Sequence, residues 1–297
     1  MLRIGLIGLD TSHVPGYAHR LNDPHDPEYV PGAKVVAGFP GASKDIDLSI
    51  SRVEIFTNEL RGKFGVQIMD SPEAVAEAVD LVFITSVDGR RHLEFFKQIA
   101  KFKRPTYIDK PMATTVADAK EIFRIAEEGK FPVASCSSLR FADSLSSALA
   151  EEHGPILGCD VFGPMPEQAQ LPGLFWYGIH CVEVMNVIMG RGCKQVRAFR
   201  NAHFDLITAA WADGRIATIR GLRAGHSKFG ATIHRDSHSV FVDLQNNKKS
   251  WYTRLLETLL ATLPNGKAPI EPAQTLEIMR FIEAANESRT TGNSVIL

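Results

Sequence analysis

The fold of this 297-residue chain is decided by its opening stretch, Leu2-Arg3-Ile4-Gly5-Leu6-Ile7-Gly8, which runs directly into Leu9-Asp10-Thr11-Ser12-His13. Residues 2–8 form a short apolar run that ends in glycine, the pattern of a strand buried on both faces. Residues 14–21 can form the helix that follows. A glycine-bearing turn between a first strand and a first helix is where a dinucleotide-binding fingerprint is found, so the opening predicts a Rossmann domain.

The fingerprint at this turn is incomplete. Its three glycines are spaced G-x-G-x-x-G, and here Gly8 supplies the first while Asp10 and His13 stand at the second and third positions. The second glycine normally lets the backbone approach a pyrophosphate, and a carboxylate there adds bulk and negative charge. Two like charges about 5 Å apart cost roughly 3 kcal/mol at an effective dielectric near 20. The acidic residue expected at the end of the second strand is also replaced, by Gly38-Phe39-Pro40-Gly41.

Two interpretations of this turn remain open from the residues alone. In the first, the turn binds a nicotinamide dinucleotide, NAD or NADP. The free amide groups of the helix N-terminus and the hydroxyls of Thr11 and Ser12 would hold its phosphates, and a protonated His13 would offset Asp10. In the second, Asp10 or Ser12 simply caps the helix. Gly8, Asp10, Thr11, Ser12 and His13 are therefore candidate cofactor-binding residues.

The first half of the chain alternates between strand and helix patterns. An apolar stripe predicts a helix over 48–63, and Ser71-Pro72-Glu73 begins another. Thr115, with Asp118 three residues later, resembles a capping box and begins a helix that runs to about Gly129. Six strands with intervening helices predict a doubly wound parallel sheet. Further strands are expected over 34–38, 66–69, 80–86, 106–109 and 131–136, with a helix over 92–102.

The second half has a different pattern, in which strands follow one another. Ala212-Asp213-Gly214 predicts a hairpin between two of them. One helix, 178–189, is expected inside this region, and an amphipathic helix over 273–288 closes the chain. These features predict an antiparallel α+β domain, with a Rossmann domain over 1–138 and the second domain over 139–297. Its other expected elements are a helix near 142–152 and strands over 158–162, 195–199, 205–211, 215–222 and 239–243.

The charge balance excludes some classes of partner. Lys and Arg number 33 against 34 Asp and Glu, so the net charge of -1 makes nucleic acid an unlikely main partner. The longest stretch without these four residues, 168–182, contains Pro172 and Gly173, which argues against a membrane span. The N-terminus lacks the pattern of a signal peptide. We therefore expect a cytoplasmic protein whose four cysteines are reduced.

Two histidine and cysteine arrangements are weak candidates for chemistry. His234 and His238 would share one face of a strand, but no carboxylate or cysteine completes a zinc pattern, so no metal site is expected. Cys181 next to His180 resembles a nucleophile pair. Adjacent side chains on a helix point about 100° apart, which is poor geometry for proton transfer.

Four segments resemble the Gfo/Idh/MocA family, which groups glucose–fructose oxidoreductase and inositol 2-dehydrogenase relatives. Tyr107-Ile108-Asp109-Lys110-Pro111 resembles the Glu-Lys-Pro segment of that family, and Gly178-Ile179-His180 before an apolar helix resembles its second-domain motif. The strand ending at Ser138-Leu139-Arg140-Phe141 and the tail 272–297 are also similar. The resemblance covers nearly the whole chain.

The resemblance implies a Rossmann domain joined to an open-faced sheet domain. It also implies oxidation or reduction, with NAD or NADP, at a carbinol carbon of a sugar, cyclitol or similar polyol. Lys110 would contact substrate and cofactor, and His180 would lie by the reacting hydroxyl. Pairing through the open sheet would give a homodimer or homotetramer.

Several residues qualify these expectations. Tyr177 is a further catalytic candidate, and Ser86, His92 and Asp109 are cofactor-binding candidates, although Ser86-Val87-Asp88 stands where the family usually has Asn- or Thr-Pro. Trp176 replaces the aspartate that usually precedes the histidine by four residues. Two alternative interpretations remain open: Lys110 could be an ordinary surface lysine beside a turn, and His180 a core histidine bonded to backbone. An alternative function also remains open, a same-fold protein that has lost ordinary cofactor turnover and acts as a carbohydrate-binding or non-redox protein.

Overall fold

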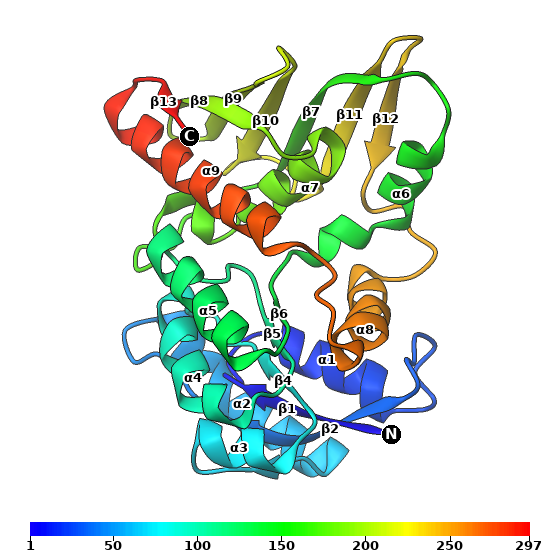
Figure 1. The fold of residues 1–297 in the computed structure, drawn as a ribbon, viewed down its shortest axis with the longest axis vertical. Coiled ribbons are helices and arrows are strands. Elements are labelled where there is room, and N and C mark those ends of the chain that lie inside the picture. The colour runs from blue at the N-terminus through cyan, green and yellow to red at the C-terminus, as the bar shows by residue number, and fades with distance from the viewer. The chain divides into compact units, whose positions relative to one another are not determined.

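The computed structural model describes residues 1–297 and divides into two compact units (Figure 1). The first unit consists of residues 1–136 and 252–272, and the second of residues 137–251 and 273–297. The boundary predicted near residue 139 lies beside the first change between units. The chain then returns to the first unit for one short segment, so neither unit is a single continuous stretch.

The first unit is built on the predicted parallel sheet, with helices on both of its faces (Figure 1). Its six strands are ordered β3-β2-β1-β4-β5-β6, all parallel, which confirms the doubly wound fold. The strands are β1 (Leu2–Ile7), β2 (Ala33–Phe39), β3 (Gln67–Ile68), β4 (Leu81–Ile84), β5 (Thr106–Ile108) and β6 (Val133–Ala134). The helices are α1 (His13–Asn22), α2 (Asp47–Phe64), α3 (Pro72–Ala78), α4 (His92–Ile99), α5 (Val116–Gly129) and α8 (Trp251–Thr262).

Local signals explain where these helices begin. The side chain of Ser71 accepts a hydrogen bond from the amide of Ala74, and Pro72 occupies the first turn of α3. Thr115 likewise accepts a bond from the amide of Asp118 at the start of α5. Because strand order reverses between β1 and β4, the carboxyl ends of these two strands flank the crevice where ligands bind in such sheets.

Helix α8 lies in a region where only one helix was expected, so that expectation is wrong. It begins with Trp251, and the rest of it packs in the first unit against α1. Arg20 and Glu28 each hydrogen-bond the hydroxyl of Thr253, and Tyr252 lies close to Gly16. Leu255, Leu256 and Leu259 are buried at helical spacing, and that apolar stripe is the signal that identifies the helix.

The second unit contains a seven-stranded mixed sheet of order β12-β11-β7-β10-β9-β8-β13. It is antiparallel except where β10 runs parallel to β7, which agrees with a mainly antiparallel α+β domain. Strand β11 is an addition to the elements that the sequence predicted. The strands are β7 (Ile156–Pro164), β8 (Cys193–Arg200), β9 (Phe204–Trp211), β10 (Ile216–Leu222), β11 (Gly230–Arg235), β12 (Ser239–Asp243) and β13 (Val295–Ile296). The helices are α6 (Asp143–Ala150), α7 (Ile179–Met189) and α9 (Pro272–Thr291), whose Pro272 still lies in the first unit.

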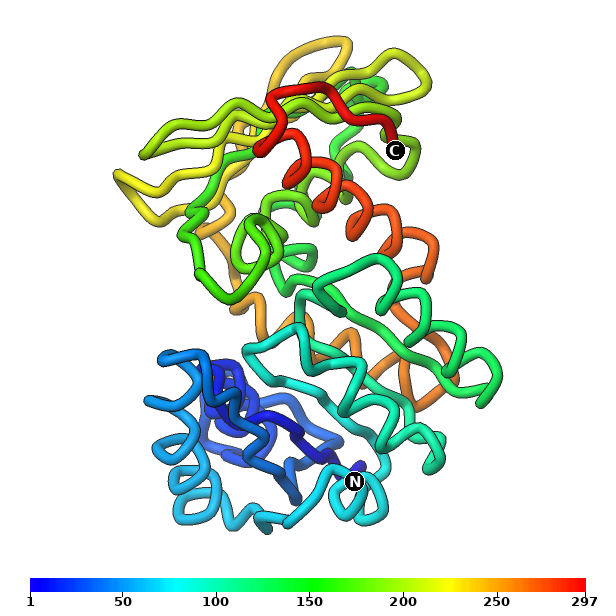
Figure 2. The backbone as a smooth tube through the Cα atoms, turned by 90° about the vertical axis from the view of Figure 1, so that its left-hand side faces the viewer, coloured from blue at the N-terminus to red at the C-terminus, as the bar shows by residue number.

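One face of this sheet is left open. Figures 1 and 2 both show α9 along one side of the strands and no helix along the other. Side chains alternate along the strands, so one row packs on α7 and α9 while the other faces outward. Large apolar side chains lie in the outward rows: Phe199 is 50% exposed, Ile216 61% and Phe241 62%. No helix of the chain is both long enough and apolar enough to cross a lipid bilayer.

Candidate functional site

The turn after β1 needs its one fingerprint glycine. Gly8 has φ +90°, and a Cβ added there would lie 2.4 Å from the backbone of Ser86, in the loop after β4. The turn leads into α1, whose N-cap residue Ser12 makes no side-chain capping bond. The amide of His13 donates instead to the hydroxyl of Thr11, at 3.4 Å. Neither Ser12 nor Asp10 therefore caps the helix.

Asp10 is fully buried and faces away from the start of α1. One carboxylate oxygen accepts a hydrogen bond from the Ser49 hydroxyl at 2.6 Å, and the other accepts one from the amide of Val87 at 2.9 Å. Burial raises the pKa of Asp10, and the hydrogen bonds from Ser49 and Val87 oppose the rise. His13 does not pair with this carboxylate, so the expected offset of its charge by His13 is wrong.

The segment after β2 folds directly onto this turn. The amide of Gly8 donates to the carbonyl of Phe39 at 2.9 Å, and the amide of Leu9 donates to that of Pro40 at 2.7 Å. A Cβ added to Gly41 would lie 3.4 Å from the Cα of Gly8. Residues 39–41 therefore pack directly against the turn at Gly8.

Further contacts fasten the same segment to the loop after β4. The Ser43 hydroxyl donates to Asp88 at 2.6 Å, and Arg91 donates to the carbonyls of Gly41 and Ala42. Burial raises the pKa of Asp88, but hydrogen bonds from Arg90 and Ser43 outweigh it, so the pKa lies below its usual value. We call residues 39–49 the β2–α2 strap. It spans the carboxyl ends of β2, β1 and β4.

His13 instead pairs with Asp109, at the end of β5. The two atoms His13 Nδ1 and Asp109 Oδ2 are 2.6 Å apart. The other oxygen of Asp109 accepts bonds from the amide of Lys110 at 2.9 Å and from the hydroxyl of Tyr107 at 3.3 Å. The His13 ring also contacts the ring of Tyr252, with centroids 5.0 Å apart.

The charges in this cluster depend on burial. Burial raises the pKa of Asp109, but the charges of His13 and Lys110 and their hydrogen bonds outweigh it and bring that pKa to about 2. Burial lowers the pKa of the Lys110 ammonium, and the carboxylate of Asp109 opposes this. Lys110 is half-buried at the carboxyl edge of the sheet, where the sequence placed it.

Of the other cofactor candidates, His92 is bound to backbone on both sides of its ring. Its Nδ1 lies 2.8 Å from the carbonyl oxygen of Pro111, and its Nε2 lies 2.8 Å from that of Ser86. The side chain is fully buried. His92 therefore holds the loops after β4 and β5 together. The hydroxyl of Ser86 accepts a hydrogen bond from the amide of Asp88.

His180 lies at the start of α7 in the second unit, near Ser137. Its Nδ1 is 2.7 Å from the Ser137 hydroxyl, and the same oxygen accepts a bond from the amide of Leu139 at 3.2 Å. Glu183, one turn along α7, accepts a bond from the amide of Ser137 and pairs with Arg140 at 2.6 Å. Burial raises the pKa of Glu183, and Arg140 opposes that rise. Ser137 is thus a polar partner of the imidazole, and Trp176 at the position four residues before His180 packs on Tyr177 instead.

Aromatic rings surround this histidine. The rings of Tyr177 and Phe229 lie 5.1 Å and 5.6 Å from that of His180, both edge-on. Trp176 contacts Tyr177, with centroids 6.1 Å apart. These contacts place aromatic rings against the imidazole of His180.

His234 and His238 lie apart from these two clusters in their described contacts. His234 lies in β11 and bonds Asp160 and Ser239, whereas His238 lies in the turn and packs on His153, so the shared strand face expected for His234 and His238 is wrong. All four cysteines are free and buried, and burial raises the pKa of Cys181 to about 12. No group of three or more His, Cys, Asp or Glu side chains is arranged to hold a metal ion.

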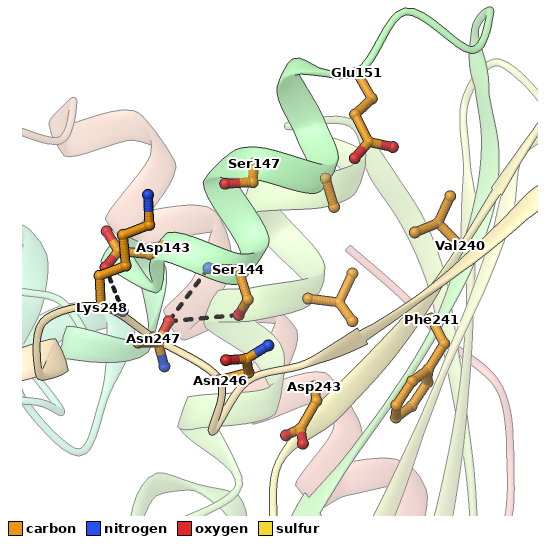
Figure 3. A pocket seen from close by; sticks show the side chains of 12 residues that line it. Asp143, Ser144, Ser147, Glu151, Val240, Phe241, Asp243, Asn246, Asn247 and Lys248 are labelled. Carbon is orange, nitrogen blue, oxygen red and sulfur yellow. Dashed lines mark hydrogen bonds between the residues drawn. The ribbon is translucent and has the colours of Figure 1, made fainter.

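A polar hollow of about 400 Å³ lies between α6 and β12 (Figure 3). Asn247 accepts bonds from the amide and hydroxyl of Ser144 across it, and Asp143 accepts a bond from the amide of Lys248. Its polar groups thus largely bond one another, as the dashed lines in Figure 3 show for Ser144 and Asn247. These hydrogen bonds join α6 to the segment after β12. None of the predicted site residues lines this hollow.

Sequence reasoning missed three partners in these clusters. Ser49 and Ser137 were not singled out, and Asp109 was not paired with His13. The pairs His13–Asp109 and Ser137–His180 are separated by 96 and 43 residues. The only sequence signal was position. Asp109 ends the predicted strand 106–109, and His13 follows the turn after the first predicted strand, so both belong at one edge of the parallel sheet.

The fold and this edge define a Rossmann domain of the dinucleotide-binding type joined to an open-sheet domain. Residues 3–135 match the model of the Gfo/Idh/MocA oxidoreductase family, described as having an NAD-binding Rossmann fold. Residues 3–135 thus belong to that family, and the resemblance predicted from the sequence is confirmed. No curated protein matches the chain.

Solved structures show the same fold over the whole chain. A myo-inositol 2-dehydrogenase from Lactobacillus plantarum is 15% identical, with a TM-score of 0.81, covering 100% of this chain and 99% of the other. A probable dehydrogenase from Thermotoga maritima is 18% identical, with a TM-score of 0.80 and 99% coverage of both chains. A Lactobacillus casei myo-inositol dehydrogenase, solved with NAD(H) and myo-inositol, is 14% identical, with a TM-score of 0.76 and coverage of 100% and 97%.

The residues of this structure fit only part of a dinucleotide. The turn at Gly8 and the first turn of α1 have the form of a phosphate site. An adenosine ribose, however, normally lies above the end of the second strand, where an acidic residue binds its hydroxyls. Here Phe39-Pro40-Gly41 stands at that position without an acidic residue, and Gly41 packs close to Gly8, since a Cβ added to Gly41 would lie 3.4 Å from the Cα of Gly8. The turn therefore fits the phosphates, whereas the carboxylate that would bind the ribose is missing.

Proposed function

We propose that the protein is an oxidoreductase that uses NAD or NADP to transfer hydride to or from a carbinol carbon of a sugar, cyclitol or similar polyol. The family of residues 3–135 and the inositol dehydrogenases that share the fold support this class. We propose the cytoplasm as its location. The observation that carries the proposal is the polar cluster of Lys110, Asp109 and His13 at the carboxyl edge of the parallel sheet.

Lys110 is proposed to bind the reacting hydroxyl of the substrate. Lys110 follows the end of β5; burial lowers the pKa of its ammonium group, and the neighbouring carboxylate of Asp109 opposes this. A cation at that position stabilises negative charge that develops on the hydroxyl oxygen. Asp109 itself is proposed to hold Lys110 and His13 in place rather than to react.

His180 is proposed as a proton-transfer residue in the second unit, with Tyr177 as its assistant. Ser137 orients the imidazole through Nδ1, which directs Nε2 away from that contact. His180 is close to the N-terminus of α7, where a positive charge is disfavoured, so the neutral imidazole is favoured. A neutral imidazole takes or gives a proton at the pH of the cell.

When bound, the dinucleotide would supply the hydride acceptor or donor. Gly8, Thr11 and Ser12 are proposed to hold its phosphates, beside Ser86 and His92 in the packed loop after β4. The β2–α2 strap packs against Asp10 and Gly8 and offers no acidic residue for the ribose hydroxyls. We therefore propose that the affinity for dinucleotide is low.

A second candidate function is a same-fold protein without ordinary cofactor turnover, which binds a carbohydrate or catalyses a non-redox reaction. The closed arrangement of Asp10, Ser49 and Val87 favours it, because a fully buried carboxylate with both oxygens bonded is a settled packing arrangement.

The two candidates are separated by titrating the protein with NADH and NADPH. Nicotinamide fluorescence, with energy transfer from the tryptophans, reports binding. Saturable binding followed by turnover on a panel of polyols supports the oxidoreductase. If calorimetry shows no binding of dinucleotide to either the wild type or Asp10→Gly, the oxidoreductase is excluded and the second candidate function is supported.

The outward face of the second sheet is the proposed contact between subunits. Phe199, Ile216 and Phe241 leave it partly apolar, and an exposed apolar sheet face favours association. We propose a homodimer, or a tetramer assembled from such dimers.

A further inference from the structure

The proton-transfer chemistry of the first unit centres on His13, which occupies the place of the third fingerprint glycine. We propose that His13, oriented by Asp109, is an acid–base catalyst that takes a proton from a substrate hydroxyl, or returns it, through Nε2, and is thus the alternative to His180 in that role; turnover of His13→Gln and of His180→Ala decides between the two. This inference rests on the proposed function for the identity of the substrate, a polyol or sugar-like molecule. It assigns a residue that the family resemblance does not provide.

The contact with Asp109 decides which nitrogen of His13 is the base. An ionised carboxylate only accepts hydrogen bonds, so the proton in the 2.6 Å contact belongs to Nδ1. Nε2 then carries the lone pair in the neutral ring. Ser137 beside His180 differs, because a hydroxyl both donates and accepts and leaves the tautomer of His180 unfixed.

The surroundings of His13 hold the ring while leaving Nε2 available. The ring lies against Tyr17 and Tyr252, at 5.8 Å and 5.0 Å, and the structure gives Nε2 no hydrogen-bond partner. The side chain of His13 is 14% exposed, against 6% for Asp109. A ring that is packed on its sides, oriented at one nitrogen and open at the other is preorganised for proton transfer.

The charged and titratable groups that face His13 favour such a cycle. Asp109 faces it from β5, with Lys110 following, while Tyr17 and Tyr252 face it from α1 and α8. Burial raises the pKa of Tyr17 well above its usual value, so its phenol stays neutral. The carboxylate of Asp109 lies where it stabilises an imidazolium that forms during proton transfer.

The step balances as a proton transfer. The O–H bond of the substrate hydroxyl breaks, its electron pair stays on oxygen, and the proton forms a new N–H bond at Nε2. The positive charge on the ring faces Asp109, and Lys110 lies next in the chain to bind the oxygen. In the oxidation proposed above, the hydride acceptor is the oxidised dinucleotide. A non-redox reaction uses the same transfer without it.

The first test reads the imidazole nitrogens of the ¹⁵N-labelled full-length protein by NMR across neutral and mildly alkaline pH. We expect the Nδ1–H tautomer for neutral His13 in the wild type. Asp109→Asn reverses the hydrogen bond, because an amide can donate to Nδ1, and should move the proton to Nε2. An Nε2–H tautomer in the wild type, or a ring that stays doubly protonated wherever the protein is folded, would overturn the proposal without any variant.

The second test measures turnover of myo-inositol with NAD⁺, with His19→Gln as the matched control on the same helix. His13→Gln should lower turnover by roughly 10²–10⁴-fold and remove the acidic limb of the pH profile, where protonation of the base abolishes activity, whereas His19→Gln should not. Unchanged turnover in His13→Gln would overturn the catalytic role.

A third test keeps the inference separate from the proposed function. If the wild type neither binds dinucleotide nor turns over, the oxidoreductase proposal fails, and acylation by diethyl pyrocarbonate then tests the dyad. His13 should react at least as fast as His19, although its side chain is 14% exposed against 31%, and Asp109→Asn should slow only His13. A His13 that reacts no faster in the wild type than in Asp109→Asn would overturn the dyad.

Discussion

The hydroxyl of Ser49 donates a 2.6 Å hydrogen bond to the carboxylate of Asp10, so the first turn of α2 is fastened to the turn after β1. The other oxygen of Asp10 holds the amide of Val87, beyond β4. One carboxylate therefore joins the turn after β1, the loop after β4 and the first turn of α2 at the carboxyl edge of the sheet. Its removal should affect both cofactor affinity and stability, in opposite directions.

We predict that Asp10→Gly binds NADH more tightly than the wild type, on the order of tenfold to a hundredfold, because a buried like charge and the strap contact are both lost. Asp10→Asn is the matched control, since it removes the charge and keeps the shape. Calorimetry measures the affinities. An equal gain in both variants assigns the effect to charge, a gain only in Asp10→Gly assigns it to the strap, and no gain in either contradicts the prediction.

Kinetics test Lys110 and His180. His180→Ala should lower turnover by roughly 10²–10⁴-fold and leave dinucleotide affinity nearly unchanged, because the imidazole is proposed to act on the substrate alone. Lys110→Ala should damage both turnover and substrate binding. Ser137→Ala should have a smaller effect on turnover than His180→Ala, since it removes only the orienting contact. Wild-type turnover in His180→Ala would take that residue out of the mechanism.

The pair His13–Asp109 should make the protein sensitive to acid. The pKa of Asp109 falls from 3.8 to about 2 in the folded state, a shift worth about 2 kcal/mol. Because the folded pKa is depressed, this stability is present above pH 3.8 and is lost as the pH falls through about 2. Chemical denaturation between these values should show a shallower pH dependence in Asp109→Asn and in His13→Gln. The exposed Asp70, changed to Asn, serves as the control, and equal slopes in all proteins would contradict the prediction.

The open sheet should mediate self-association. Ile216→Arg places a charge in the outward row of β10 and should raise the dissociation constant of the dimer by about tenfold or more. Ile55→Arg is the control, because Ile55 is similarly exposed, at 63% against 61%, but lies on α2 of the first unit. Light scattering at micromolar concentration measures the mass. A monomeric wild type, or equal weakening by both variants, would contradict this interface.

The elements of the parallel sheet could be predicted because their signals are local. Buried strands such as β4 are continuous apolar runs, and Ser71 and Thr115 mark helix starts by their own side chains. Helix α8 carried an equally local stripe of leucines and was predictable from it. Strand β11 was harder, because Gly230 and His234 interrupt its apolar pattern and its register depends on pairing with β7 and β12.

The site could be predicted by position but not by contact. Strand ends placed Gly8, Ser86 and Lys110 at one edge of the sheet. Nothing in the sequence could show that Asp10 bonds Ser49, or that His13 reaches Asp109, because such pairs depend on how loops from distant strands pack side by side. Charge alone suggested a pairing of His13 with Asp10, and the structure instead gives each a different partner.

The return of residues 252–272 to the first unit has a consequence for synthesis on the ribosome. Tyr252 lies against His13, and Thr253 bonds Arg20 and Glu28, so the surface of α1 stays uncovered until these late residues emerge. By then nearly all of the second unit has been translated. The first unit therefore cannot complete its fold until most of the second unit has been synthesised. A gene truncated near residue 136 would encode a Rossmann domain without residues 252–272, which cover α1.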